Sequence, residues 1–310
     1  MSASILFYSD LHLSIGPRVP IRPEMRRFWC RFGWCGEKLM DRFEDRLRME
    51  SGRIQRITRA WLSRHATEYD FLINGGDLAL PLALHDERMD ATQRIWRDEL
   101  ATYGENRYFA LTGNHELGYG YDPEPDSYPD LMSLRNTLFH NEINLHGFGR
   151  LRIEEVSVLF LDSELLSIAF QRPYDPEITQ TLQTMLSLVQ ETIESDDPVV
   201  IFTHNTIRLR RWMIQAGGLW NRLLARGRRV ILIGGHFHIP RMMKRSGAEI
   251  HWSGGASYPE PMLRYLVRVP FTGILRGGAG GVEVFLENGG IAILHRSFNH
   301  PKQYLAVSAA

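Results

Sequence analysis

Five short apolar runs recur along this chain, and each one ends in a loop that carries Asp, Asn or His. The runs cover residues 5–8, 71–74, 108–111, 199–202 and 230–233. Apolar runs of this length, bounded by turn residues, are typical of strands that are buried on both faces. Open α/β sheets bind ligands at the carboxyl ends of their strands. The five loops are therefore expected to meet along one edge of the molecule.

The segments between these runs predict an α/β core. Helical patterns cover 38–66 (bent near 51–52), 84–102, a segment that begins at Asp175-Pro176, and 207–226, which is weakened at Gly217-Gly218. Residues 118–147 are expected to form a long loop with short helical pieces, and 149–154 and 157–162 a hairpin. Alternation of strand and helix favours parallel pairing. The β-rich tail after residue 240 predicts a second sheet beside the first.

Composition indicates an ordinary soluble protein. Lys plus Arg and Asp plus Glu both total 36, but residues 16–66 hold 13 basic and 6 acidic residues, and no other basic track is expected. No uninterrupted apolar run approaches the length of a membrane-spanning helix, and the N-terminus lacks the pattern of a signal peptide. Cys30 and Cys35 are too few for a disulfide framework. We therefore expect one domain over 1–310, located in the cytoplasm.

The loops after the strands carry the candidate chemistry. Their polar residues are Asp10, His12, Asp77, Asn114, His115, Glu116, His204, His236 and His238. Carboxylate, amide and imidazole groups together suit divalent ions such as Mn, Fe or Zn. A lone Asp-x-His or Gly-Asp would carry little weight, because such pairs are common in structural turns. All five groups in this order, each at a strand end, favour a metal site over chance or core packing.

This order resembles the calcineurin-like metallophosphoesterase superfamily, whose pattern is D-x-H, G-D, G-N-H-[D/E], H and G-H-x-H. The resemblance spans residues 10 to 238 and implies two stacked mixed β-sheets flanked by helices. It also implies two metal ions and a metal-bridging hydroxide as the nucleophile. Carried over residue by residue, the first metal would be bound by Asp10, His12 and His238, the second by Asn114, His204 and His236, and both by Asp77.

The resemblance assigns His115 a catalytic role rather than a ligand role. It would donate a proton to the leaving oxygen or hold a phosphate oxygen, and Glu116 is a candidate to position it. Protein serine/threonine phosphatases carry Asp-Arg-Gly at the second motif, which is absent here. Purple acid phosphatases place a tyrosine where this chain has Leu80, so an iron–tyrosinate site is not expected.

The insertion at about 16–66 distinguishes this chain from minimal relatives. It resembles the basic, aromatic insertion of bacterial phosphodiesterase-like members, and Arg26, Arg27, Trp29 and Trp34 are its candidate substrate-binding residues. It could cap the metals, contact an anionic membrane surface, or pack as an amphipathic hairpin with solvated arginines. We favour packing for 38–66 and a role at the site for 22–34.

The leading functional prediction is a phosphodiesterase or pyrophosphatase that acts on a small or amphiphilic phosphate ester. A phosphomonoesterase of the same fold is the nearest alternative, because the metal ligands do not distinguish the two. A metal-dependent nuclease is less favoured, because nucleic acid would require a basic track for the phosphate backbone. A non-catalytic scaffold should have lost ligands, and no motif residue is missing.

Overall fold

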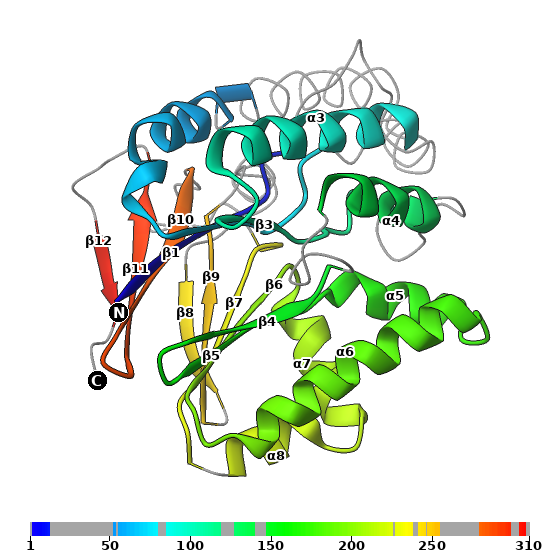
Figure 1. Cartoon of the computed structure of the whole chain (residues 1–310), viewed down its shortest axis with the longest axis vertical. Helices are drawn as coiled ribbons and strands as arrows, with labels where there is room; N and C mark the ends of the chain where they lie inside the picture. The colour runs from blue at the N-terminus through cyan, green and yellow to red at the C-terminus, as the bar shows by residue number, and fades with distance from the viewer. Residues whose placement is uncertain are drawn as a thin grey trace, which may run out of the picture.

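The described part of the chain forms two six-stranded β-sheets. The computed structural model describes residues 2–12, 52–53, 55–79, 85–118, 127–139, 147–225, 227–237, 241–245, 247–254 and 279–298, with the backbone of 304–307. The strands of the first sheet run in the order β12-β11-β10-β1-β2-β3, and those of the second in the order β4-β5-β6-β7-β9-β8. The two sheets lie in separate layers with helices outside them (Figure 1).

The first sheet combines parallel strands from the amino-terminal part with antiparallel strands from the tail. Its strands are β1 Ala3–Tyr8, β2 Phe71–Asn74, β3 Tyr108–Ala110, β10 Gly280–Glu287, β11 Gly290–Ser297 and β12 Tyr304–Val307. β1 pairs with β2, and β2 with β3, in parallel, whereas β10, β11 and β12 join antiparallel beyond β1.

The second sheet is parallel at its centre and antiparallel at both edges. Its strands are β4 Gly149–Ile153, β5 Val156–Phe160, β6 Val199–Thr203, β7 Val230–Gly234, β8 Arg241–Arg245 and β9 Ala248–Trp252. β5, β6, β7 and β9 pair in parallel. β4 and β8 are the antiparallel edge strands.

The core between the sheets follows from the two-residue period of each strand. Ile5 and Phe7 of β1 belong to an inner cluster with residues from the second sheet, while Leu6 and Tyr8 belong to the cluster that includes the helices. Phe7 stacks on Phe202 across the sheets with ring centroids 5.8 Å apart. Both faces of these strands are buried, which is why the corresponding sequence runs are continuously apolar.

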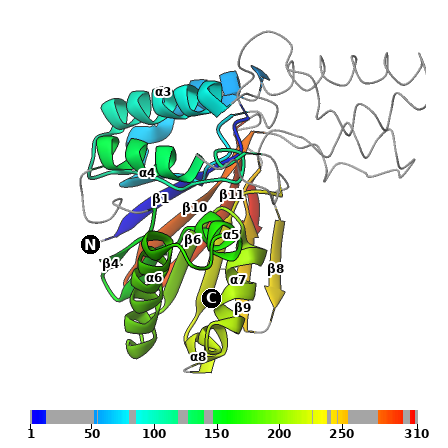
Figure 2. The same cartoon turned by 90° about the vertical axis from the view of Figure 1, so that its right-hand side faces the viewer.

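Helices cover the outer faces of both sheets. They are α3 His85–Tyr103, α4 Ser127–Leu138, α5 Ser163–Gln171, α6 Pro176–Glu194, α7 Thr206–Gln215 and α8 Leu219–Ala225. α3 and α4 lie in one layer, and α5 to α8 lie in the opposite layer (Figures 1 and 2). None of the helices in the described part of the chain combines the length and apolar character of a bilayer-spanning helix.

The two-sheet α/β fold agrees with the sequence prediction, and four details differ from it. The helix expected at 207–226 is two helices, because Gly217 and Gly218 adopt φ of 64° and 66° between α7 and α8. The expected loop at 118–147 contains the 12-residue helix α4. α5 follows the predicted hairpin directly and was not foreseen. The strands described in the tail form no sheet of their own, because they are divided between the two sheets.

Most of the insertion at about 16–66 lies outside the described residues. Within it, residues 55–65 are helical, and the 3-10 turn η1 Ala66–Glu68 follows them before β2. Trp61 of this helix is buried and stacks on Phe298 at 4.4 Å between ring centroids. This end of the insertion therefore packs on the body of the protein, as predicted for part of 38–66.

Candidate metal centre

The carboxyl ends of the central strands are in register and bring the predicted loops together. Tyr8 pairs with Asn74, which pairs with Ala110 in the first sheet, and Thr203 pairs with Gly234 in the second. The motif residues follow these positions by one to six residues. Loops from both sheets therefore meet at one edge, as the strand-end pattern predicts.

The backbone of these loops adopts an unusual conformation. Within the described residues, six non-glycine residues have positive φ, and four of them are motif residues: Asp10 (60°), His12 (43°), Asp77 (55°) and His236 (68°). Left-handed backbone costs an ordinary residue about 1–2 kcal/mol. Backbone hydrogen bonds hold it in place, from Asp10 N to Gly76 O at 2.9 Å and from His12 N to Asp77 O at 3.0 Å. Such strain is concentrated at functional sites.

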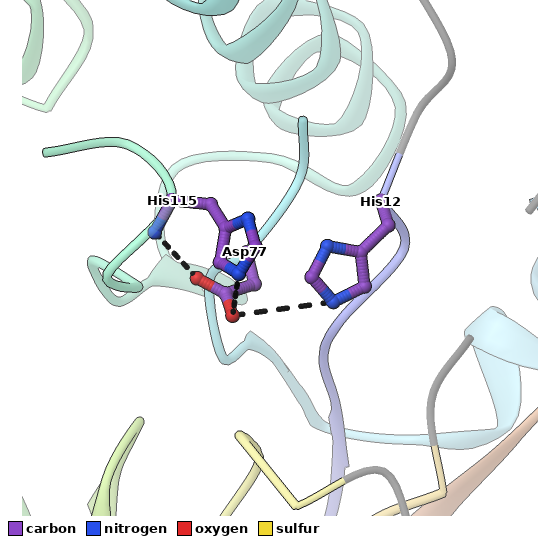
Figure 3. Close-up of side chains that lie close together, drawn as sticks. All are labelled: His12, Asp77 and His115. Atoms are coloured by element: carbon purple, nitrogen blue, oxygen red, sulfur yellow. Dashed lines mark hydrogen bonds and ion pairs between the residues drawn. The ribbon is translucent and has the colours of Figure 1, made fainter. Parts of the chain in front are cut away.

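Asp77 lies at the centre of the cluster. Its Oδ1 accepts a hydrogen bond from the backbone N of His115 at 2.9 Å. Its Oδ2 is buried without a hydrogen-bond partner. His204 Nε2, His115 Nε2 and His12 Nε2 lie 3.2, 3.6 and 4.0 Å from Oδ2. Figure 3 shows the rings of His12 and His115 turned toward this carboxylate.

His204, His236 and Asn114 form the second half of the cluster. Asn114 Oδ1 lies 3.1 Å from His204 Nε2 and 2.8 Å from His236 Nδ1. His204 Nδ1 donates to the backbone carbonyl of Gly75 at 2.8 Å. In the neutral ring, that bond leaves Nε2 with its lone pair facing the cluster, which is how ligand histidines are usually oriented.

The carboxylate of Asp10 links the two sheets. The backbone N of His236 donates to its Oδ1 and Oδ2 at 3.1 and 3.0 Å. Oδ1 lies 3.9 Å from His12 Nε2. Ser9 Oγ donates to Oδ2 of Asp10 and lies 2.7 Å from Ser253 Oγ. The sequence analysis missed Ser9 and Ser253; Ser9 precedes a motif residue, but nothing near Ser253 in the sequence indicates its position.

Glu116 supports the loops through their backbone. Its Oε2 accepts hydrogen bonds from Asp77 N at 3.0 Å and Gly113 N at 2.7 Å, and its Oε1 from Leu78 N at 2.7 Å. The side chain is fully buried. This carboxylate therefore joins the second and third motif loops, which is a positioning role rather than the contact with His115 that we expected.

The charged groups of the cluster shift one another's pKa. Burial raises the pKa of Asp77, and the neighbouring His204 opposes that shift. Burial alone would lower the pKa of His204, but the carboxylates of Asp77 and Asp10 outweigh burial and raise it. Ligand histidines must be neutral to bind a metal, so cation binding here would release protons.

The donor set and the shape of the cluster fit divalent cations. Ligand atoms of His12, Asp77 and His115 lie within 4.8 Å of one another, as do those of Asp77, His204 and His236. Asp77 belongs to both groups. A Cβ at Gly113 would collide with the side chain and backbone N of Asp77, so only glycine allows this approach. A buried carboxylate oxygen without a hydrogen bond, surrounded by imidazole nitrogens, is well suited to a cation.

The structure brings together eight of the predicted residues and leaves five outside the described part of the chain. Asp10, His12, Asp77, Asn114, His115, Glu116, His204 and His236 converge at this edge. Of these, His115 lies close enough to Asp77 and His12 to join the first ligand group, although the resemblance sets it apart from the ligands. His238, Arg26, Arg27, Trp29 and Trp34 lie outside the described residues.

Comparison with known proteins gives a family and a fold. The sequence profile of the calcineurin-like phosphoesterase family matches residues 3–240. A dimetal phosphatase from Danio rerio is similar in structure, with a TM-score of 0.51, 13% identity, and 99% of each chain covered. The purple acid phosphatase PPD1 from yellow lupin has a TM-score of 0.55 and 12% identity, covering 98% of this chain and 53% of that one.

A third similar structure is GAP50 of Plasmodium, described as an anchor in the inner membrane complex. Its TM-score is 0.53 at 11% identity, covering 100% of this chain and 89% of that one. At these identities the structures establish a shared fold. A comparison with curated proteins found no match.

Proposed function

This chain belongs to the calcineurin-like phosphoesterase family, and we propose that it is a phosphodiesterase or pyrophosphatase with a binuclear metal centre. Its substrate is a small or amphiphilic phosphate ester. The observation that carries the proposal is Asp77, whose buried Oδ2 is shared by two potential ligand groups. One carboxylate can bridge two cations and offset their mutual repulsion.

Different residues of the chain would bind the metal ions, support the ligand loops and transfer the proton. Asp77, His204, His236 and Asn114 would hold one cation, and Asp77, Asp10, His12 and His238 the other. Two such cations lower the pKa of water and neutralise charge on a phosphate group. Glu116 and Ser9 would keep the ligand loops in place through the contacts described above.

His115 is the proposed proton donor to the leaving oxygen. Its side chain is only partly buried, whereas His12, Asp77 and His204 are buried completely or nearly so. Its Nε2 faces the cluster at 3.6 Å from Asp77 Oδ2. A histidine at the exposed side of the cluster can reach a leaving group that approaches from solvent. The competing role is that of an additional ligand.

The preference for diesters or pyrophosphates rests on the sequence resemblance and not on described contacts. Arg26, Arg27, Trp29 and Trp34 are proposed to grip the substrate at the site entrance. A panel of mononucleotides, cyclic nucleotides, nucleotide-linked lipids, phospholipid headgroups and single-stranded DNA, assayed with Mn²⁺, distinguishes this preference from monoesterase or nuclease activity.

Removal of the shared ligand tests the metal centre. Asp77→Ala should lower hydrolysis of bis-p-nitrophenyl phosphate by more than about 100-fold. That factor is the upper end of the loss when a residue that only supports a metal ligand is removed, and Asp77 is proposed to be a ligand itself. Metal content, measured by elemental analysis, should fall in parallel. His65→Ala, on the surface beside Glu68, is the matched control. Full activity of chelator-treated wild-type protein would show that the proposal is wrong.

Replacement of His115 separates catalysis from metal binding. His115→Ala should retain the wild-type metal content while kcat falls by about 100-fold to 10,000-fold, the usual contribution of a general acid. The loss should be larger for alkyl than for nitrophenyl leaving groups, because alkoxides need the proton more. A loss of metal equal to that in Asp77→Ala would instead identify His115 as a ligand.

A further inference from the structure

A long acid-free stretch of the chain contains His204 and His236 of the candidate metal centre. Residues 198–248 contain no Asp or Glu, whereas their Lys and Arg residues are Arg208, Arg210, Arg211, Arg222, Arg226, Arg228, Arg229, Arg241, Lys244 and Arg245. The expectation that basic residues concentrate only in 16–66 is therefore wrong. The stretch includes α7, α8 and the edge strand β8.

Several of these arginine and lysine side chains form ion pairs or hydrogen bonds with other parts of the chain. Arg208 pairs with Glu164, and Arg229 with Glu249 at 3.1 Å. Arg228 is buried and donates to backbone carbonyls at the end of α6, including Thr192 O at 2.9 Å. Arg222 lies 3.8 Å from Glu194, and Lys244 faces Glu249 in the β8–β9 register. The side chains of Arg226 and Arg241 lie outside the described part of the chain, and Arg210, Arg211 and Arg245 remain for another role.

Arg210, Arg211 and Arg245 have no acidic partner among the described residues. Arg210 on α7 is close enough to Arg245 on β8 that burial and this like charge both lower its pKa. Its guanidinium lies 5.5 Å from the ring centroid of Trp220, so it is held in position by stacking. Arg211 and Arg245 are exposed. α7 and β8 overlap in Figure 2, and Figure 1 shows β7 and β9 between them.

Two exposed isoleucines flank these arginines on α7. Ile207 is 57% exposed and Ile214 is 39% exposed, although most large apolar side chains in the described residues are buried. Residues seven apart lie on one face of a helix, so Ile207 and Ile214 share a stripe with Arg211 between them. We call Ile207, Arg210, Arg211, Ile214 and Arg245 the α7–β8 surface. Basic and aliphatic side chains on one exposed face can together contact the charged headgroups and the apolar boundary of a membrane.

One end of the α7–β8 surface lies at the metal centre, and Arg245 lies at the other end, because it pairs with Ala248 at the start of β9. Asn205, which caps α7, follows His204 directly, and its side chain accepts a hydrogen bond from Arg208 N. Trp252 Nε1 at the end of β9 donates to Thr206 Oγ1 at 2.8 Å. The first turn of α7 is therefore attached to the edge at which the ligand loops meet, and Ile207 lies three residues from His204.

We propose that the α7–β8 surface binds the anionic headgroup layer of a lipid bilayer and holds the metal centre beside it. Arg210, Arg211 and Arg245 match negative headgroups in charge, and Ile207 and Ile214 insert at headgroup depth. The surface carries no exposed aromatic side chain among the described residues, as stacking on nucleic-acid bases would require. The inference that this surface brings a membrane-borne substrate to the metal centre rests on the proposed function. The inference that it binds lipid does not.

Co-sedimentation of the full-length protein with vesicles tests the proposal. Vesicles of phosphatidylcholine containing about one-third phosphatidylglycerol should bind the protein, and phosphatidylcholine alone should not. Each arginine near a membrane surface strengthens binding about fivefold, so Arg211→Glu/Arg245→Glu should weaken it at least twentyfold. Ile207→Ser/Ile214→Ser should weaken vesicle binding several-fold. The loss should persist at salt concentrations that screen the charges of the arginines.

Arg94→Glu/Arg97→Glu is the matched control, because it makes the same charge change on exposed positions of α3 in the other helical layer. It should bind vesicles like the wild type. Equal binding to both vesicle types, or binding unaffected by the two α7–β8 variants, would overturn the proposal. If the α7–β8 variants lost binding to a single-stranded oligonucleotide but bound vesicles like the wild type, the partner would be nucleic acid instead.

Hydrolysis of bis-p-nitrophenyl phosphate without vesicles separates this proposal from the proposed function. The α7–β8 variants should keep the wild-type rate, which also shows that they are folded. If the wild type binds anionic vesicles but hydrolyses no phosphate ester, the proposed function fails and the docking surface stands. If hydrolysis is intact but vesicle binding is absent, only the docking surface fails.

Discussion

At the scale of single residues, the site combines strained backbone with hydrogen bonds that hold the ligand loops in place. Asp10, His12, Asp77 and His236 adopt left-handed conformations that cost free energy individually. The carboxylate of Glu116 offsets part of that cost by accepting three backbone N–H groups from two loops. Its role is to keep Asp77 in a conformation that the isolated loop would not hold.

Glu116→Gln should lower both stability and metal affinity. The amide NH₂ of glutamine would face a backbone N–H, so at least one charge-assisted hydrogen bond is lost and a donor is left unpaired. The free energy of unfolding should fall by about 2 kcal/mol or more, as measured by urea denaturation. Metal affinity should fall by about 10- to 100-fold.

Glu105→Gln is the control for this substitution. Glu105 is exposed at the end of α3, and its replacement should change the free energy of unfolding by less than about 0.5 kcal/mol. If Glu116→Gln behaves like this control in both measurements, the loop-joining role of Glu116 is refuted.

At the scale of secondary-structure elements, side-chain caps set where helices begin. Asp162, Asp175 and Asn205 cap α5, α6 and α7, and each accepts hydrogen bonds from backbone N–H groups in the first turn. The start of α6 was predictable because Asp175 is followed by Pro176, which is favoured in the first turn. The start of α5 was not, because Asp162 closes the apolar run that forms β5.

Asp175→Ala should destabilise the protein by about 0.5–2 kcal/mol, the usual cost of removing an N-cap. The hydrogen bonds from Glu177 N at 3.0 Å and Ile178 N at 3.2 Å would be lost. Thermal unfolding measures the change. Asp175→Asn should stay close to the wild type, since asparagine caps equally well, and a similar loss in both variants would contradict this explanation. Metal content should be unchanged in both.

At the scale of the whole molecule, a buried histidine pair joins the two sheets. His251 of β9 and His295 of β11 lie in different sheets, and His251 Nδ1 is 3.1 Å from His295 Nε2. Burial lowers the pKa of each to about 4, and Glu249 opposes this shift at His251 while Arg229 and Lys244 add to it. Both rings are therefore neutral in the folded protein, and His251 acts in the structure rather than in the metal site.

This pair predicts a loss of stability in acid. The pKa of histidine is about 6.5 in the unfolded chain, so between pH 6.5 and about 4 the unfolded state binds protons that the folded state does not. Stability is then fully present above pH 6.5 and falls as the pH is lowered, by up to about 1.4 kcal/mol per pH unit for each histidine.

Urea denaturation of chelator-treated protein at several pH values between 7 and 5 measures this slope. His251→Leu/His295→Leu should flatten it, because both partners become apolar and neither is left unpaired. His65→Gln, which replaces a partly exposed histidine, should leave the slope unchanged. A double variant with the wild-type slope would show that the pair is not responsible.

The sequence by itself determined the central strands, the α/β class and the residues at the carboxyl ends of the strands. Buried strands must be apolar on both faces, and polar residues that end them stand out against such runs. Residues 5–8, 71–74 and 199–202 are therefore recognisable without any tertiary information, and so are Asp10, Asp77 and His204 beyond them. The family motifs follow from the same local signal.

Only the tertiary structure decided which side chains that are distant in the sequence contact one another. Ser253 reaches Ser9 across 244 residues, and His251 reaches His295 across 44. The acid-free stretch is visible in the sequence, but the pairing of Arg208 with Glu164 and the proximity of Arg210 to Arg245 are not. Local sequence encodes burial and backbone preference, whereas the energy of a charge or hydrogen bond depends on distant groups that folding brings within a few ångströms.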